Sequence, residues 1–217
     1  MGAADRSGLG LGTFAQQHQR YLKESAAHPS LEPTLYLIWF GLNDLVTNGR
    51  DKTKMKAVAV EICTLCEELF HRSANSYFII ANIPNPQGAV RFMGRELTEM
   101  VCDYQAGSFE FGFELARQVA IFPAQRATLI DLYTPVEHIN DNLAAYGLTK
   151  GAQPHGVRVR YGGEQGPAGL QFTATSDEAH PTEAVYRLIA QMWAGEILQR
   201  FELGNLRNSG NGHFDVL

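Results

Sequence analysis

The chain has 217 residues, of which 45% are hydrophobic and 19% charged, with a net charge of −5. This length and balance fit one globular domain over residues 1–217, with residues 202–217 as a C-terminal tail. The acidic charge argues against nucleic-acid binding, which needs a basic surface. No apolar run is long enough to span a bilayer, and residues 1–12 lack the apolar core of a signal peptide. We therefore expect a cytoplasmic chain as it stands, while the compartment of a full protein stays open.

Apolar periodicity predicts alternating helices and strands. Continuous apolar runs predict strands over residues 35–40, 77–83 and 127–133. Helical spacing predicts helices over residues 14–22, 55–69, 110–121 and 136–145, and a last helix that begins at Pro181. A glycine-rich stretch over residues 147–169 is either a lid on the substrate side or disordered.

Strands that alternate with helices favour a parallel sheet between two helical layers. Continuous apolar strands agree with this, because both faces of such a sheet are covered. We predict a three-layer α/β/α fold of the flavodoxin-like kind. In such folds the chemistry gathers at the carboxyl ends of the strands.

The chain has three cysteines, and two of them form the pattern Cys63-x-x-Cys66. This pattern occurs in redox sites and in half of a zinc site. However, it lies within a predicted helix and has no second Cys/His pair nearby. We expect both cysteines to be buried as small apolar groups, and we expect no metal and no cofactor.

The first candidate motif is Gly41-Leu42-Asn43-Asp44, directly after the first predicted strand. Glycine allows a sharp turn there, and the Asn43 amide could donate a hydrogen bond to a developing oxyanion. Alternatively, Asn43 or Asp44 caps the segment that follows.

The second candidate motif is Asp177-Glu178-Ala179-His180-Pro181-Thr182, before the last helix. Histidine is the usual general base near neutral pH, and a carboxylate three residues earlier could fix its tautomer. Alternatively, Asp177 interacts with the helix dipole and His180 is incidental.

Taken together, these two motifs resemble the third and fifth sequence blocks of the GDSL (SGNH) hydrolase family. Residues 14–22, 129–133 and 146–148 are also similar to segments of that family, so the resemblance extends to about Phe201. It implies an SGNH-like fold and hydrolysis of carboxylic esters through an acyl-serine intermediate. Asn43 would be an oxyanion-hole donor, His180 the general base and Asp177 its orienting residue. The substrate would be a small-molecule, lipid or carbohydrate ester.

The family's nucleophile is a serine in a Gly-Asp-Ser turn after its first strand, and no such turn is found. The nearest imitation is Ser7, which has no strand before it. The eight serines are Ser7, Ser25, Ser30, Ser73, Ser76, Ser108, Ser176 and Ser209. Three hypotheses follow: a truncated and inactive esterase, a hydrolase that uses an atypical serine or one from another chain, or a catalytically dead binding or regulatory domain.

The missing block has a structural consequence as well. In the family the first strand lies beside the strand that here spans residues 35–40. Without it, that strand has an open edge, which proteins rarely leave uncovered. We predict that self-association into a homo-oligomer or a terminal segment covers this edge, with residues 213–217 as one candidate.

Overall fold

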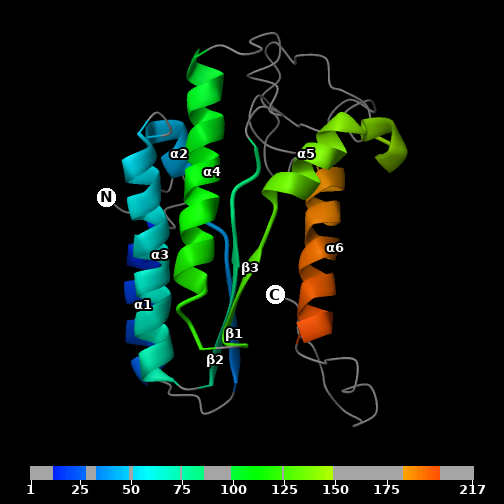
Figure 1. Ribbon diagram of the computed structural model, residues 1–217. Helices are drawn as coiled ribbons and strands as arrows, with labels where there is room; N and C mark the ends of the chain where they lie inside the picture. Colours follow the sequence, from blue (N-terminus) through cyan, green and yellow to red (C-terminus); the bar gives the residue numbers. More distant parts are fainter. Residues whose placement is uncertain are drawn as a thin grey trace, which may run out of the picture.

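The computed structural model describes residues 12–27, 33–48, 51–73, 75–85, 99–123, 125–148 and 183–200. Within these ranges the protein consists of a three-stranded sheet, six α-helices and one short 3-10 helix (Figure 1). The elements are, in chain order, α1 (Phe14–Ala27), β1 (Thr34–Ile38), α2 (Leu42–Asn48), α3 (Lys52–Arg72), β2 (Ser76–Ala81), α4 (Glu99–Val119), β3 (Ala127–Ile130), α5 (Tyr133–Asp141), η3 (Leu143–Tyr146) and α6 (Glu183–Arg200).

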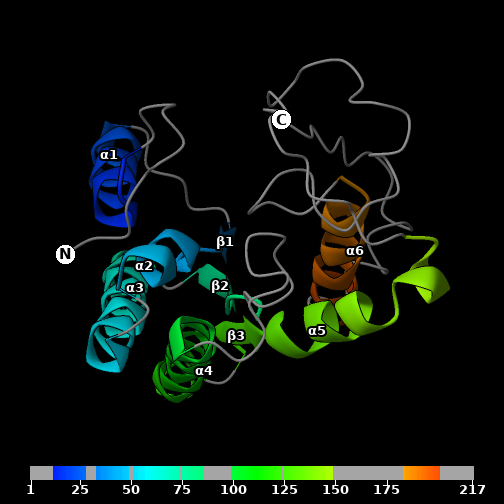
Figure 2. The ribbon, with the colours of Figure 1, turned by 90° about the horizontal axis from the view of Figure 1, so that it is seen from above.

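The sheet is parallel, with the strand order β1-β2-β3. Ile38 of β1 is in register with Ile80 of β2, and Ala81 of β2 is in register with Ile130 of β3. Seen from above, α1 to α4 lie on one side of the sheet and α5 and α6 on the other (Figure 2). The predicted α/β fold with a parallel sheet between helices is therefore confirmed.

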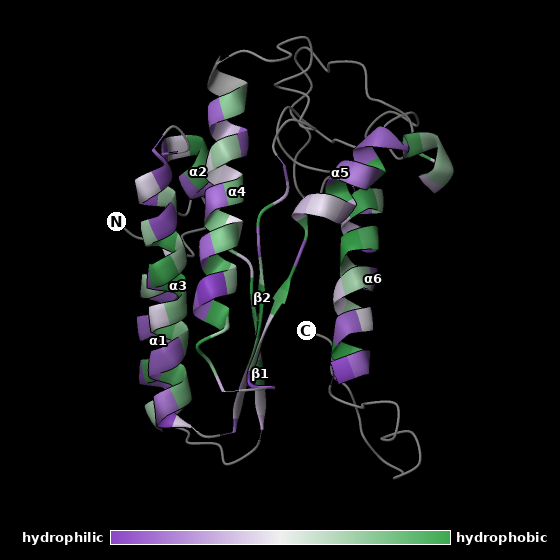
Figure 3. Cartoon of the chain, viewed as in Figure 1, coloured by the Kyte–Doolittle hydropathy of each residue, from purple (hydrophilic) through white to green (hydrophobic). Residues whose placement is uncertain are grey.

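Alternate side chains of the strands enter two separate cores, as the two-residue period of a strand requires. Ile38, Phe78 and Ile80 pack with α1 to α4, whereas Ile79 and Ile130 pack with α5 and α6. In Figure 3 hydrophobic colours dominate the strands, while α3 and α6 carry both hydrophobic and hydrophilic residues. This pattern explains why the strands read as continuous apolar runs in the sequence.

The elements differ from the predicted ones mainly at their ends. β1 stops at Ile38, and the apolar residues Trp39 and Phe40 follow it outside the strand. Both side chains still contribute to the cores, because the Trp39 ring packs against the Trp193 ring (centroids 6.4 Å apart) and the Phe40 ring against the Phe14 ring (4.8 Å).

The third strand and the helices on either side of it also differ in length from their predicted ranges. β3 stops at Ile130 because α5 begins at Tyr133, and α4 begins at Glu99 rather than near Glu110.

β1 lies at one edge of the sheet, and within the described ranges it pairs only with β2. Its Leu37 side chain is 52% exposed. What covers this edge stays a prediction, since residues 213–217 lie outside the described residues. No helix in the described part of the chain is both long and apolar enough to cross a membrane.

Candidate active site

Three loops leave the sheet at the same end, because the carboxyl ends of parallel strands lie together. They follow β1, β2 and β3, and each carries polar side chains within five positions of the strand's last residue. The residues concerned are Asn43 after β1, Asn82 and Asn85 after β2, and Asp131 after β3. This end of the sheet is therefore where the predicted chemistry would have to occur.

The loop after β1 requires glycine at position 41. Gly41 has a φ of +113°, and a Cβ atom there would lie 2.7 Å from Cζ of the buried Phe111 ring. Its carbonyl accepts the first helical hydrogen bond of α2, from the Leu45 N–H at 2.8 Å. Gly41 is thus the N-cap, and Asn43 and Asp44 both lie inside the helix.

The two polar residues of this loop differ in burial. Asp44 is only 3% exposed, whereas Asn43 is exposed. The Asn43 carbonyl accepts a hydrogen bond from the Thr47 hydroxyl at 2.9 Å, within α2. The motif therefore presents Asn43, and not Asp44, to solvent beyond the end of β1.

A buried asparagine joins the ends of β2 and β3. The Asn82 side-chain carbonyl accepts hydrogen bonds from the backbone N–H groups of Leu132 (2.6 Å) and Tyr133 (3.2 Å). Its amide nitrogen donates to the Asp131 carboxylate at 2.8 Å, which also accepts from the Tyr133 N–H at 3.0 Å. Asn82 thereby fixes where α5 begins relative to the sheet.

A carboxylate at this end of the sheet is held in its ionised form. Partial burial alone would raise the pKa of Asp131. The hydrogen bonds from Asn82, Thr134 and Tyr133 outweigh it and lower the pKa below its usual value. The Asp131 carboxylate is thus an acceptor near neutral pH and not a proton donor.

Next to this network lies a small pocket of about 290 Å³ between the starts of α3 and α5 and the side of α4. Lys52, Gln105, Phe109 and Tyr133 are among its lining residues. Burial and the nearby carboxylates of Glu137 and Asp131 raise the pKa of Tyr133, so its hydroxyl stays protonated near neutral pH. The lining therefore includes a hydroxyl, an ammonium group and, from Glu110, a carboxylate.

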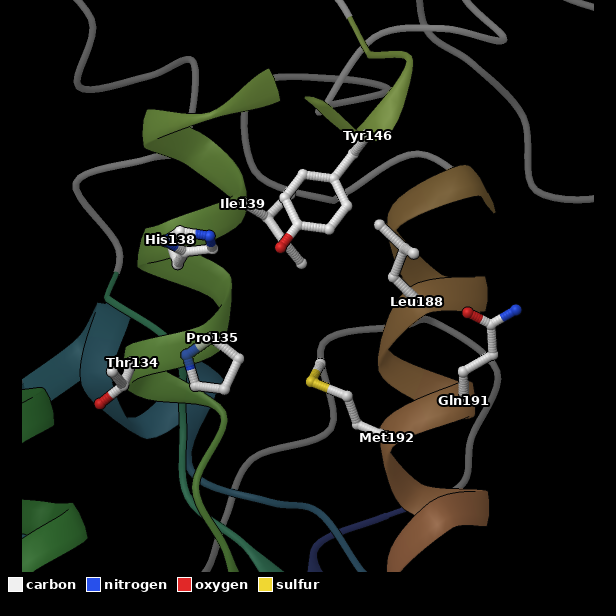
Figure 4. A pocket seen from close by; sticks show the side chains of 8 residues that line it. All are labelled: Thr134, Pro135, His138, Ile139, Tyr146, Leu188, Gln191 and Met192. Atoms are coloured by element: carbon white, nitrogen blue, oxygen red, sulfur yellow. The ribbon is translucent and has the colours of Figure 1, made fainter. Parts of the chain in front are cut away.

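A second depression is a groove of about 530 Å³ between α5 and α6 (Figure 4). Figure 4 shows Pro135 and Ile139 on the α5 side and Leu188 and Met192 on the α6 side, with Tyr146 above them. Thr134, His138 and Gln191 supply its polar groups. A groove with this lining suits an apolar group better than a charged one.

Neither the cysteines nor the acidic residues form a metal site within the described ranges. No group of three or more His, Cys, Asp or Glu residues there could hold a metal ion. Cys63 and Cys66 are buried in α3, as predicted, and burial raises the pKa of both thiols, for Cys63 to about 12. These thiols are packing groups and not reactive ones.

The second sequence motif falls outside the described part of the chain. Asp177 and His180 both lie in residues 149–182, so their distance to Asn43 stays untested. The helix that follows this motif is described: α6 begins at the end of the molecule where the strands have their carboxyl ends (Figure 1).

The sequence analysis missed the network around Asn82. A signal was present, since Asn82 and Asn85 lie just after the buried strand β2, as Asn43 lies just after the first predicted apolar run. Their partners lie about 50 residues further along the chain: Asn82 bonds Asp131, and the Asn85 amide donates to Glu137 at 2.9 Å. Pairing them required knowing that β2 and β3 are neighbours.

Comparison with known proteins adds no identity to this geometry. No protein-family model matches the chain, and no curated protein is significantly similar to it.

Proposed function

We propose that this protein is an SGNH-type ester hydrolase, with Asn43 as an oxyanion-hole donor, His180 as the general base and Asp177 as the residue that orients the histidine. The observation that carries the proposal is the position of Asn43. It is exposed in the loop that follows the carboxyl end of a parallel strand, after a glycine that no other residue can replace without strain.

The position of α6 supports the same proposal. The helix begins at the end of the sheet where Asn43 lies, and His180 precedes its first residue, Glu183, by three positions. Three residues span at most about 11 Å. The short tether gives the proposed base access to the same end of the sheet.

In this mechanism the Asn43 amide would donate a hydrogen bond to the oxygen that becomes negative in the tetrahedral intermediate. His180 would remove the proton from a serine hydroxyl as it attacks the ester carbonyl, and would later return it to the leaving alcohol. The nucleophilic serine stays unassigned, either an atypical one of this chain or one from a second chain.

The test is hydrolysis of a short-chain aryl ester by the full chain. Asn43→Ala should lower kcat by about 10²- to 10³-fold, the usual effect of losing one oxyanion donor. His180→Ala should lower it by several orders of magnitude. The matched controls are Asn48→Ala, at the other end of α2, and His71→Ala, exposed near the end of α3. Equal rates for His180→Ala and wild type would refute the proposed base.

The alternative is a binding domain of the same fold that does not hydrolyse its ligand. The observation that favours it is the groove between α5 and α6, whose apolar lining would accept an acyl chain. This alternative predicts that the chain shows no esterase activity but binds a fluorescent fatty acid. It also predicts that Leu188→Glu abolishes this binding.

A further inference from the structure

The outward face of α4 carries an exposed apolar stripe. Phe111 and Leu115 of this helix are fully buried and face the sheet. On the opposite side, the Phe109 and Phe113 side chains are 62% and 56% exposed. Residues at spacings of four, seven and eleven positions from Phe109 fall on one line along a helix. The exposed residues on this line are Phe109, Phe113, Ala116 and Ala120, and Cys102 extends it toward the start of the helix.

A helix that is apolar on two opposite faces is unusual at a protein surface. One face of α4 packs on the sheet, and one flank is tied to α3 by the ion pair between Lys56 and Glu110, at 3.1 Å. The stripe lies on neither of these sides. Two exposed phenylalanines one helical turn apart form an apolar patch of the kind that is typical of contacts between proteins.

We propose that this stripe is a dimer interface, in which α4 packs antiparallel against α4 of a second copy of this chain. The order of side-chain sizes selects this partner and this direction. Along the stripe two large residues are followed by two small ones. A two-fold axis near residues 114–115 places Phe109 opposite Ala120 of the second copy, and Phe113 opposite its Ala116. A parallel pair would set phenylalanine against phenylalanine and leave a void between the alanines.

The charges beside the stripe agree with the antiparallel arrangement. Glu110 and Arg117 lie on the same flank, seven residues apart. With the axis near residues 114–115, Arg117 lies about 3 Å along the helix axis from Glu110 of the second copy. Because of the two-fold symmetry, the dimer would contain two such ion pairs. In a parallel two-fold pair the two copies of this flank would lie on opposite sides of the interface, so Glu110 and Arg117 could not pair across it.

Both charged residues already have neighbours of opposite charge within the chain. Glu110 lies next to Lys56, and Arg117 contacts Glu114 at 2.9 Å. The dimer would therefore extend two existing ion pairs into networks and would not leave any charge buried alone. The stripe from Cys102 to Ala120 is about 27 Å long, so the interface is small. We expect a reversible dimer with a Kd on the order of micromolar.

Sedimentation velocity of the full chain over a wide concentration range measures the assembly. The protein should shift from a 24.0 kDa monomer to a species of twice that mass as its concentration rises. Phe113→Glu should weaken dimerisation at least tenfold. Leu198→Glu on α6 is the matched control, since both side chains are 56% exposed, and it should leave the Kd unchanged. Unchanged urea unfolding would show that both variants fold.

Cross-linking through single cysteines tests the direction of packing. In a Cys102→Ser background, Ala116→Cys should cross-link readily, because the two copies of this position are about 4.5 Å apart along the helix axis. Ala120→Cys should not, because its copies are about 16 Å apart along that axis. In a parallel pair both positions would cross-link.

Three results would overturn the proposal. A wild-type chain that stays monomeric at every concentration would show that no second copy covers the stripe. A dimer that Leu198→Glu weakens as much as Phe113→Glu would place the interface elsewhere. Equal cross-linking through positions 116 and 120 would rule out the antiparallel direction.

Discussion

Replacing Asn82 with alanine should remove the hydrogen bonds that hold the start of α5 against the ends of β2 and β3. The Leu132 N–H, which donates to Asn82 at 2.6 Å, belongs to a fully buried residue. Leaving such a donor unsatisfied costs about 1–3 kcal/mol. The Asp131 carboxylate also loses its donor at 2.8 Å, but water can replace part of that bond because Asp131 is exposed. We expect a total loss of about 2–4 kcal/mol.

Urea unfolding followed by circular dichroism measures this loss. With an m-value of about 2–3 kcal/mol/M, the midpoint should fall by about 0.7–2 M. Asn48→Ala is the control, since no side-chain hydrogen bond of Asn48 is found among the described residues. A midpoint for Asn82→Ala no lower than that of Asn48→Ala would refute the idea that Asn82 anchors α5.

Asn82→Asp separates the acceptor from the donor. This variant keeps an oxygen for the Leu132 and Tyr133 N–H groups but places a second carboxylate next to Asp131. Two carboxylates at hydrogen-bond distance repel each other until one is protonated. The variant should therefore be destabilised at pH 7 and recover toward wild type as the pH falls toward 4. A pH-independent deficit would contradict this account of the network.

Three further predictions concern the loop after β1, the cysteines and Asp131. Gly41→Ala should destabilise the protein by about 2 kcal/mol or more in urea unfolding, because φ is +113° and the added Cβ meets an aromatic ring; a stable variant would show that the turn tolerates a side chain. In the native protein at pH 8 a thiol-reactive disulfide reagent should modify one cysteine per chain, the exposed Cys102, because Cys63 and Cys66 are buried and their pKa values are raised. Modification of all three cysteines without denaturant would contradict the burial of Cys63 and Cys66. Since the folded state lowers the pKa of Asp131 below 3.8, its carboxylate adds stability above about pH 4 that is lost as the pH falls through the folded-state pKa; the deficit of Asp131→Asn should be full at pH 7 and shrink below pH 4.

The sequence predicted the layers of the fold better than the limits of its elements. Continuous apolar strands between helical patterns are typical of a parallel sheet. They are continuously apolar here because the two faces of β2 pack into two separate cores. The start of α4 was missed because Gly107 and Ser108 weaken its helical pattern just before Glu110. A further glycine lies inside the predicted range, and packing explains it: a Cβ at position 112 would lie 3.3 Å from the Asn82 amide nitrogen.

The candidate site was predictable only where its residues are close in sequence. Gly41 and Asn43 are two positions apart, so a turn and an exposed amide could be inferred from one motif. The bond between Asn82 and Asp131 joins residues 49 positions apart and depends on the order of the strands. The exposed stripe of α4 was missed for another reason: apolar helix positions are expected to face a core, and only the structure shows which of them do not.

The central claim of the proposed function is that the Asn43 amide and the His180 ring share one pocket. If both act on the same ester group, the two side chains lie within roughly 8 Å of each other. Spin labels on Asn43→Cys and His180→Cys in a Cys102→Ser background measure this distance by pulsed electron resonance, since the buried Cys63 and Cys66 resist labelling. We predict one narrow distance distribution centred below about 20 Å, allowing for the length of the labels. A distribution near 40 Å, about the diameter expected for a domain of this size, would place the two groups on opposite sides and contradict the claim.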